Sequence, residues 1–235
     1  MSENIEVVLI DIGNTRIKTA EVTNGKIGEL QYWDKIEQIA VAYNSDQHFM
    51  VCSTRAEPLQ LKNVHYLDHA SPLPIELDYH TPKTLGPDRI AAAVGALELF
   101  PTTTTLIIDI GTCMTMDLIT KEGIFKGGVI SPGLKMRMKS MAQFTGRLPD
   151  ISEKWSQLSY NLLGKSTDEC LLSGSYGGMV SEIKQAYQQL SEDFTSINVI
   201  LTGGDADHFE SIVKAHIFAG SKIVLTGLYR IWKSI

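Results

Sequence analysis

The sequence predicts an α/β protein built from two related halves, and three observations lead to this prediction. One segment occurs twice, because Val8–Val22 and Leu106–Thr120 align without gaps at an offset of 98 residues. Both copies have the pattern of a strand, an Asp-Ile-Gly turn and a second strand. Helix and strand patterns alternate in the later part of the chain. The chain of 235 residues, with 43% hydrophobic and 20% charged residues, is long and apolar enough to bury a sizeable core.

The first half is expected to consist mainly of strands. Aliphatic residues before Asp11 predict a buried strand that returns through a tight turn. Weaker strand patterns at residues 26–31 and 49–53 enclose an amphipathic stretch over residues 36–43. Four prolines within residues 71–87 exclude a continuous helix and predict an extended loop.

A helix is expected directly after this loop, from residue 88 to residue 100. Its apolar residues recur on one face, and Asp88 stands where an N-cap or a first-turn acid is favoured. Pro101 and four threonines then predict a domain boundary near residue 100, with one domain over residues 1–100 and another over residues 101–235.

The second half begins with the second Asp-Ile-Gly hairpin. The elements expected after it are a helix carrying Lys135, Arg137 and Lys139, a helix over residues 168–190, a strand over 197–202, a helix from Asp205 and a terminal helix over 226–232.

Composition narrows the possible partners. The net charge of -6 excludes a broad basic surface for nucleic acid, and no apolar run is long enough to span a membrane. The acidic opening residues run almost at once into a strand pattern, unlike a secretory signal, so we expect a cytoplasmic protein. Three cysteines without CxxC spacing are expected to be reduced thiols, and six histidines share no metal-ligand spacing.

The first repeat carries the strongest local motif, residues 11–18. Its glycine lets backbone amides approach a phosphate, Asn14 and Thr15 can donate hydrogen bonds, and Lys18 adds a positive charge. Asp11, at the end of a buried strand, is suited to hold a phosphate-bound magnesium ion through water. Taken alone, the motif is explained equally well by an ordinary hairpin turn.

The second repeat favours the functional interpretation. Two acidic turns at equivalent positions are expected to face each other and bind one polyphosphate. Thr112 offers a hydroxyl to a phosphate, Asp109 is a candidate cation ligand, and Asp117 is interpreted as mainly structural.

A third motif lies where the proline-rich loop becomes a helix, at residues 84–89. Helix starts attract anions, Arg89 can bind a carboxylate with two hydrogen bonds, and Asp88 can accept a proton from a hydroxyl. Plain helix capping by Asp88 is the alternative. Weaker glycine-rich segments follow at residues 127–134, 164–167 and 202–205. The first is expected to be a flexible turn that opens into the next helix, and Thr167 of the second is either an N-cap or a ligand contact.

The ordered set of motifs resembles the type III pantothenate kinases, within the superfamily of actin, hexokinase and Hsp70-like ATPases. In order, the motifs are DIGNTRIK, LGPDR, DIGTCMTMD, GGVISPGL, GKST and TGGD, and the resemblance spans residues 7–205. It implies two duplicated ribonuclease H-like domains with the nucleotide in the interdomain cleft, and a homodimer.

The resemblance also implies roles for individual residues. Asp109 would ligate a monovalent cation, K⁺ or NH₄⁺, and Asp88 would accept the proton of the substrate hydroxyl, either as a general base or as an orienting acceptor. The residues implied for ATP are Asp11, Ile12, Gly13, Asn14, Thr15, Arg16, Ile17, Lys18 and Thr112. The residues implied for pantothenate are Tyr79, Gly86, Pro87, Asp88, Arg89 and Thr167.

The expected activity is transfer of the ATP γ-phosphoryl group to pantothenate, giving 4'-phosphopantothenate for coenzyme A synthesis. Two departures from the family pattern are Cys113, where alanine is common, and a shortened stretch before LGPDR. One alternative is a kinase of another small hydroxylated metabolite. The other is a non-catalytic nucleotide-binding regulator, a transcriptional accessory factor, against which the intact Asp11, Asp88 and Asp109 argue.

Overall fold

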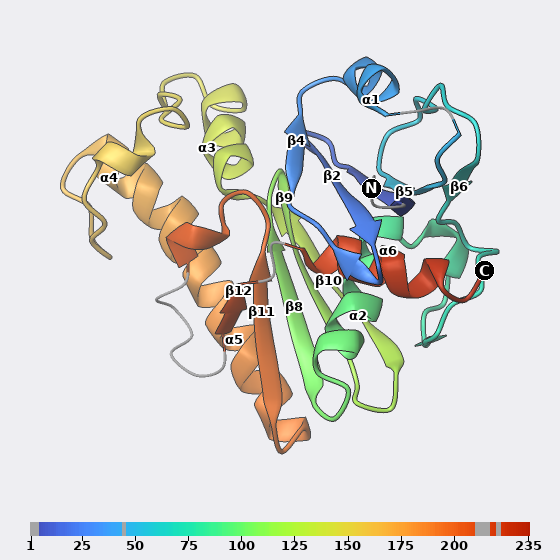
Figure 1. Ribbon diagram of the computed structural model, residues 1–235. Coiled ribbons are helices and arrows are strands. Elements are labelled where there is room, and N and C mark those ends of the chain that lie inside the picture. The colour runs from blue at the N-terminus through green and yellow to red at the C-terminus, as the bar shows by residue number, and fades with distance from the viewer. Residues whose placement is uncertain (1–4, 44–45, 210–216, 220–221) are drawn as a thin grey trace. The chain divides into compact units, whose positions relative to one another are not determined.

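The computed structural model describes residues 5–43, 46–209, 217–219 and 222–235 (Figure 1). They form two compact units, and each unit combines segments that are separated along the chain. Unit 1 comprises residues 1–105, 117–127 and 220–235, and unit 2 comprises residues 106–116 and 128–219. The boundary near residue 100 rests on Pro101 and the threonines that follow it, and it stays a prediction.

The first sheet has six strands in the order β3-β2-β1-β5-β6, with β4 also paired to β2. Strand β1 is antiparallel to β2 and parallel to β5. The strand expected at residues 26–31 is wrong as a single element, because residues 28–30 separate β3 from β4. The strands are β1 (Ile5–Ile12), β2 (Ile17–Thr23), β3 (Lys26–Ile27), β4 (Gln31–Trp33), β5 (Phe49–Ser53) and β6 (Val64–Tyr66).

Strand β1 is buried from Val7 to Ile12, which explains its nearly continuous apolar sequence. Val8, Ile10 and Ile12 belong to a core cluster that also contains Ile39 of helix α1 (Ile36–Ala42). Side chains alternate along a strand, so Asp11 faces the other side of the sheet. Helices α2 (Pro87–Leu99) and α6 (Ile223–Trp232) contact the sheet at β1 and β5.

Helices α2 and α6 lie side by side in unit 1 (Figure 1). A Cβ on Gly227 would lie 1.8 Å from the carbonyl oxygen of Ala91, and a Cβ on Gly95 would lie 2.1 Å from that of Ile223. The two backbones therefore touch where each helix has a glycine. The terminal helix begins at Ile223, three residues before its expected start, and helix α2 begins at Pro87 with Asp88 in its first turn.

The second sheet has the strand order β12-β11-β8-β9-β10-β7. The second hairpin and the strand at residues 197–202 are confirmed. Residues 127–132, expected in a flexible turn, instead belong to strand β10, because β-branched residues continue the strand through Gly127 and Gly128. The strands are β7 (Glu76–Leu77), β8 (Thr104–Ile110), β9 (Cys113–Ile119), β10 (Ile124–Pro132), β11 (Ile197–Thr202) and β12 (Ile217–Ala219).

The helices of unit 2 differ from the expectation in two places. The helix predicted over residues 168–190 is α4 (Thr167–Leu172) and α5 (Gly178–Asp193), joined by a π-helical turn at Ser173–Gly177. The helix predicted from Asp205 is a short 3-10 turn, Ala206–Phe209, beyond which residues 210–216 lie outside the described residues. The helix predicted after residue 134 is confirmed as α3 (Leu134–Gln143).

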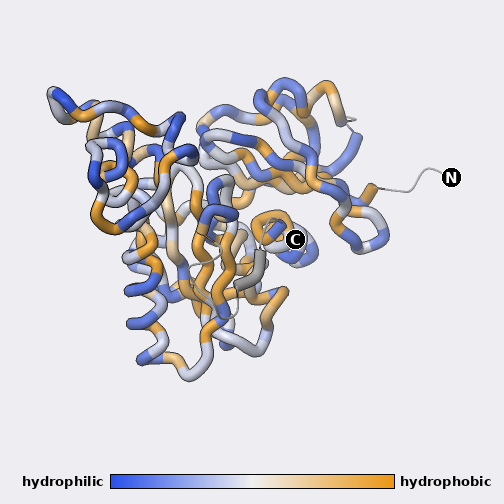
Figure 2. The backbone as a smooth tube through the Cα atoms, turned by 90° about the vertical axis from the view of Figure 1, so that its left-hand side faces the viewer, coloured by the Kyte–Doolittle hydropathy of each residue, from blue (hydrophilic) through white to orange (hydrophobic). Residues whose placement is uncertain are grey.

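Hydropathy follows the fold. Figure 2 shows hydrophobic residues gathered along the strands, whereas turns and the outer sides of helices carry hydrophilic ones.

The proline-rich loop contains one 3-10 turn, Pro82–Thr84, and another lies at Trp155–Gln157. Within the described ranges, we find no helix with the length and apolar character needed to cross a membrane.

We predict that Gly227→Ala lowers the free energy of unfolding by about 3 kcal/mol, because the added methyl group meets the backbone of helix α2 and the two helices must separate. Urea unfolding measures the change. Gly146→Ala is the matched control, since its Cβ would meet nothing within 4 Å. Equal stability of the Gly227 variant and the wild-type protein would contradict helix contact at this glycine.

Candidate active site

Two side chains of the first acidic turn and one of strand β5 lie in one row across the first sheet. Asp11 of β1 pairs with Lys18 on antiparallel β2 and with Cys52 on parallel β5. Paired residues on neighbouring strands project to the same face of a sheet. The register therefore places a carboxylate between an ammonium group and a thiol.

Asp11 is only 9% exposed. The Cys52 thiol donates a hydrogen bond to its Oδ1 at 3.4 Å. Burial raises the pKa of Asp11, Lys18 and the thiol hydrogen bond lower it, and the negative charge of Asp88 raises it further. The Asp11 carboxylate thus has few partners for its charge, which suits a ligand that brings positive charge.

The turn after Asp11 is held by the residues that follow β5. Gly13 N–H bonds the carbonyl of Arg16 and closes the hairpin. Both the backbone N–H and the hydroxyl of Thr54 donate to the carbonyl of Ile12, at 3.0 and 3.2 Å. Arg55 donates from Nε to the Gly13 carbonyl at 2.9 Å and from Nη2 to the Asn14 carbonyl at 3.2 Å.

Asp88 lies in the first turn of helix α2, where Gly86 is the N-cap. The Asp88 Oδ1 accepts the backbone N–H of Arg89 at 2.9 Å, and a Cβ on Gly86 would lie 2.5 Å from this oxygen. A side chain at position 86 would therefore displace this carboxylate from the helix start. Burial raises the pKa of Asp88, which makes its carboxylate a better proton acceptor.

Arg89 forms a buried ion pair with Asp117, and the two side chains are 8% and 2% exposed. Its Nε contacts both carboxylate oxygens at 3.0 Å, and its Nη2 also donates to Asp117. The guanidinium lies 5.9 Å from the centre of the Phe125 ring, and Tyr79 packs edge-on against the same ring. Asp117 therefore holds a candidate substrate-binding residue, which refines its expected structural role.

In unit 2, two other segments pack on the second acidic turn. Gly111 N–H bonds the carbonyl of Cys113, and Gly133 N–H bonds that of Thr112. Gly203 has a positive φ of 99°, and a Cβ there would lie 2.3 Å from the carbonyl oxygen of Ile110 and 2.6 Å from an oxygen of Asp109. Only glycine fits this approach, so the structure brings together three motifs that are distant in sequence.

Three further predicted site residues lie in unit 2. Thr112 and Thr167 are exposed, and Asp109 is half-buried. Thr167 is the first residue of helix α4, and its neighbour Ser166 is the N-cap, accepting the backbone N–H of Glu169 at 3.3 Å. Ser166, and not Thr167, is therefore the N-cap of helix α4.

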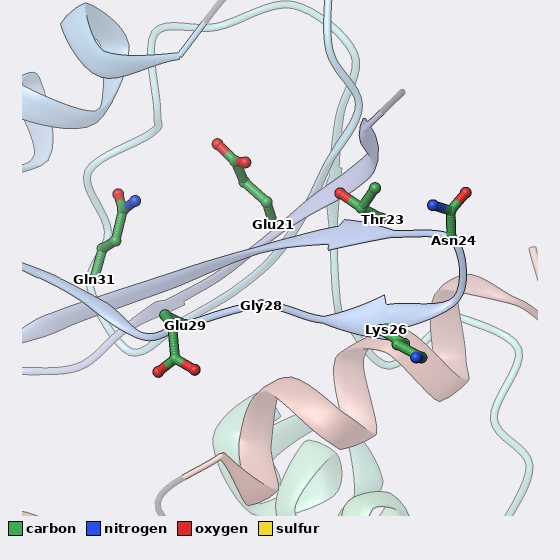
Figure 3. A pocket seen from close by; sticks show the side chains of 7 residues that line it. All are labelled: Glu21, Thr23, Asn24, Lys26, Gly28, Glu29 and Gln31. Atoms are coloured by element: carbon green, nitrogen blue, oxygen red, sulfur yellow. The ribbon is translucent and has the colours of Figure 1, made fainter. Parts of the chain in front are cut away.

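A separate hollow of about 470 Å³ lies along strands β2 and β3. Figure 3 shows that its side chains point to different sides of the strands and do not converge on one ligand position. None of its residues belongs to a motif: they are Glu21, Thr23, Asn24, Lys26, Gly28, Glu29 and Gln31. We do not assign it to the active site.

Residues 52–55 contribute to the first turn, although sequence reasoning missed them. Their only sequence signal is the end of a strand followed by Ser, Thr and Arg, a pattern that does not show which turn the side chains reach. The parallel pairing of β5 with β1 supplies that information.

Comparison with protein families identifies relatives over nearly the whole chain. The family model described as type III pantothenate kinase matches residues 51–189. A type III pantothenate kinase of Cytophaga hutchinsonii is 38% identical, covering 95% of this chain and 97% of its own. One from Christiangramia forsetii is 36% identical, covering 94% and 95%.

Solved structures share the fold at lower identity. A Campylobacter jejuni protein, described as a conserved putative Baf family transcriptional activator, has a TM-score of 0.68 at 22% identity, covering 97% of this chain and 98% of its own. A ROK family glucokinase from Streptomyces griseus, solved with glucose and AMPPNP, has a TM-score of 0.54 at 14% identity, covering 96% and 98%. These likenesses confirm the expected actin-like ATPase fold.

We predict that Asp117→Asn lowers the free energy of unfolding by roughly 3 kcal/mol, because the buried Arg89 charge loses its partner. Chemical denaturation measures the loss. Asp78→Asn, which breaks the exposed pair with Lys126, is the control and should cost much less, because water screens an exposed ion pair. Similar losses for both variants would show that the buried pair has no special importance.

Asp88→Asn should instead raise the free energy of unfolding at neutral pH. The folded-state pKa of Asp88 is raised above its ordinary value of 3.8. Its contribution therefore favours folding below the unfolded-state pKa and is lost as pH rises through the folded-state pKa. The difference in free energy of unfolding between the variant and the wild-type protein should shrink as pH falls to 3.8. Unfolding curves of both proteins across this range measure it, and a pH-independent difference would contradict the raised pKa.

Proposed function

Because this chain belongs to the type III pantothenate kinases, we propose that it transfers the γ-phosphoryl group of ATP to pantothenate, giving 4'-phosphopantothenate. The observation that carries this proposal is that unit 1 contains both the buried carboxylate of Asp11 and the half-buried carboxylate of Asp88. One carboxylate ends the strand before the phosphate-binding turn, and the other begins the helix of the acceptor motif. A kinase needs these two functions close together, since phosphoryl transfer depends mainly on alignment and charge neutralisation.

In this proposal Asp11–Lys18 and Thr112 bind the ATP phosphates. Their chemistry supports the assignment, because the turn supplies backbone amides and a lysine. The buried Asp11 carboxylate would hold Mg²⁺ through water. When bound, Mg²⁺ neutralises charge on the phosphate oxygens.

Asp109 is the proposed ligand of a monovalent cation, K⁺ or NH₄⁺. Its half-buried carboxylate supplies the hard oxygen donors that such an ion requires. Gly203 approaches one of its oxygens from the neighbouring segment, so the carboxylate is enclosed by backbone as well as by its own strand.

Pantothenate carries a hydroxyl and a carboxylate, and the helix start of α2 offers a partner for each. Asp88 accepts the hydroxyl proton, and Arg89 attracts the carboxylate. The Nε and Nη2 atoms of Arg89 donate hydrogen bonds to Asp117, which holds the guanidinium in place. Tyr79, Gly86, Pro87 and Thr167 complete the proposed substrate-binding set. The close fit between Gly86 and the Asp88 carboxylate supports a fixed position for the proton acceptor.

A regulatory function gains no support from the Campylobacter jejuni likeness, because 22% identity shows the fold alone. A homodimer is proposed from the family. A cytoplasmic location is proposed as well, supported by three cysteines that are all free thiols.

ADP release from Mg·ATP should require pantothenate and should fall when Na⁺ replaces K⁺.

Asp88→Asn should lower turnover by roughly 10²- to 10⁴-fold without loss of folding, because the hydroxyl loses its proton acceptor. A coupled ADP assay measures these rates, with other small hydroxylated acids and sugars as comparison acceptors.

Near-normal turnover of the Asp88→Asn protein would remove Asp88 from this role. A faster rate with another acceptor would replace pantothenate as the substrate. Nucleotide binding without release of ADP in the presence of any acceptor would favour the regulator.

A further inference from the structure

Three consecutive carbonyl groups of the first acidic turn are bound from one side by two residues after strand β5. Thr54 binds the carbonyl of Ile12, and Arg55 binds those of Gly13 and Asn14. Arg55 is outside every motif that the sequence analysis singled out.

The direction of these carbonyls determines where the turn's amides point. In a trans peptide the N–H points opposite to the C=O of the same unit. When Arg55 holds the carbonyls of Gly13 and Asn14, the N–H groups of Asn14 and Thr15 are directed away from Arg55. Backbone amides that point in the same direction form the concave anion sites typical of phosphate-binding turns.

The guanidinium also changes the strength of these amides. A charged donor on a carbonyl polarises the peptide and makes the attached N–H a better donor. Arg55 therefore acts on the phosphate-binding atoms through the peptide groups.

Arg55 is itself held in place. Its backbone N–H bonds the Ser53 hydroxyl at 3.1 Å, and that hydroxyl donates to the carbonyl of Arg55 at 2.9 Å. The residue follows directly from β5, whose pairing with β1 aligns Ser53 with Ile12. Its side chain is half-buried, so the protein can lose the guanidinium without opening its core.

We propose that Arg55 is a positioning residue of the nucleotide site, which orients the amides of the first acidic turn for the phosphates of ATP by binding the carbonyls of Gly13 and Asn14. The proposal rests on the function proposed above, because it assumes that this turn binds ATP. The fork of a guanidinium is essential to it, since Nε and Nη2 reach two carbonyls at once and a lysine ammonium lacks this planar fork.

The test compares Arg55→Met, Arg55→Lys and the control Arg230→Met. Arg230 also lies in unit 1 and is partly exposed, but its partner is Glu98, outside the motifs. Binding of Mg·AMPPNP is measured by titration calorimetry in the absence of an acceptor, together with KM for ATP, KM for pantothenate and the thermal midpoint of unfolding.

We expect Arg55→Met to raise the Kd for Mg·AMPPNP and the KM for ATP by about 10-fold, with little change in KM for pantothenate or thermal midpoint. Arg55→Lys should resemble Arg55→Met, and Arg230→Met should resemble the wild type. Wild-type affinity in Arg55→Lys would show that only charge matters and would overturn the positioning role. So would wild-type affinity in Arg55→Met, or an equal loss in Arg230→Met.

The two proposals fail separately. If the wild-type chain binds Mg·AMPPNP but does not phosphorylate pantothenate, the proposed function is wrong, whereas the calorimetric comparison still decides the role of Arg55. If pantothenate is phosphorylated and the Arg55 variants bind the analogue normally, the positioning role alone is wrong.

Discussion

The parallel pairing of β1 with β5 is the constraint on which the first acidic turn depends. It places Cys52 beside Asp11, where the thiol donates to the carboxylate. It also ends β5 beneath the turn, so Thr54 and Arg55 reach three successive carbonyls. A slip of one residue would turn Asp11 to the other face and separate these partners.

Three charged side chains of the candidate site, Asp11, Asp88 and Arg89, are wholly or partly buried. The carboxylates of Asp11 and Asp88 have raised pKa values, chiefly through burial. Arg89 is buried as well but has a full partner in Asp117. The paired charge positions a side chain, whereas the incompletely compensated carboxylates remain available for a cation or a proton, as phosphoryl transfer requires.

Glycines determine how closely the segments of each unit approach. Gly95 and Gly227 let helices α2 and α6 touch in unit 1, and Gly203 lets its segment pack on the Asp109 turn in unit 2. Gly86 leaves room for the carboxylate of Asp88. Such glycines serve packing and site geometry together, because a Cβ at any of them would displace backbone or a functional oxygen.

The sequence by itself determined the fold class, the two acidic turns, helix α2 and the family, because periodicity and ordered motifs are local properties of the chain. It did not predict strand β10, since its glycines suggested a turn and the stabilising strand neighbours are distant in sequence. Only the tertiary structure decided that Asp117 holds Arg89 and that Arg55 holds the first turn. Those contacts arise from strand pairing between distant segments, and no local pattern records which partner a side chain will meet.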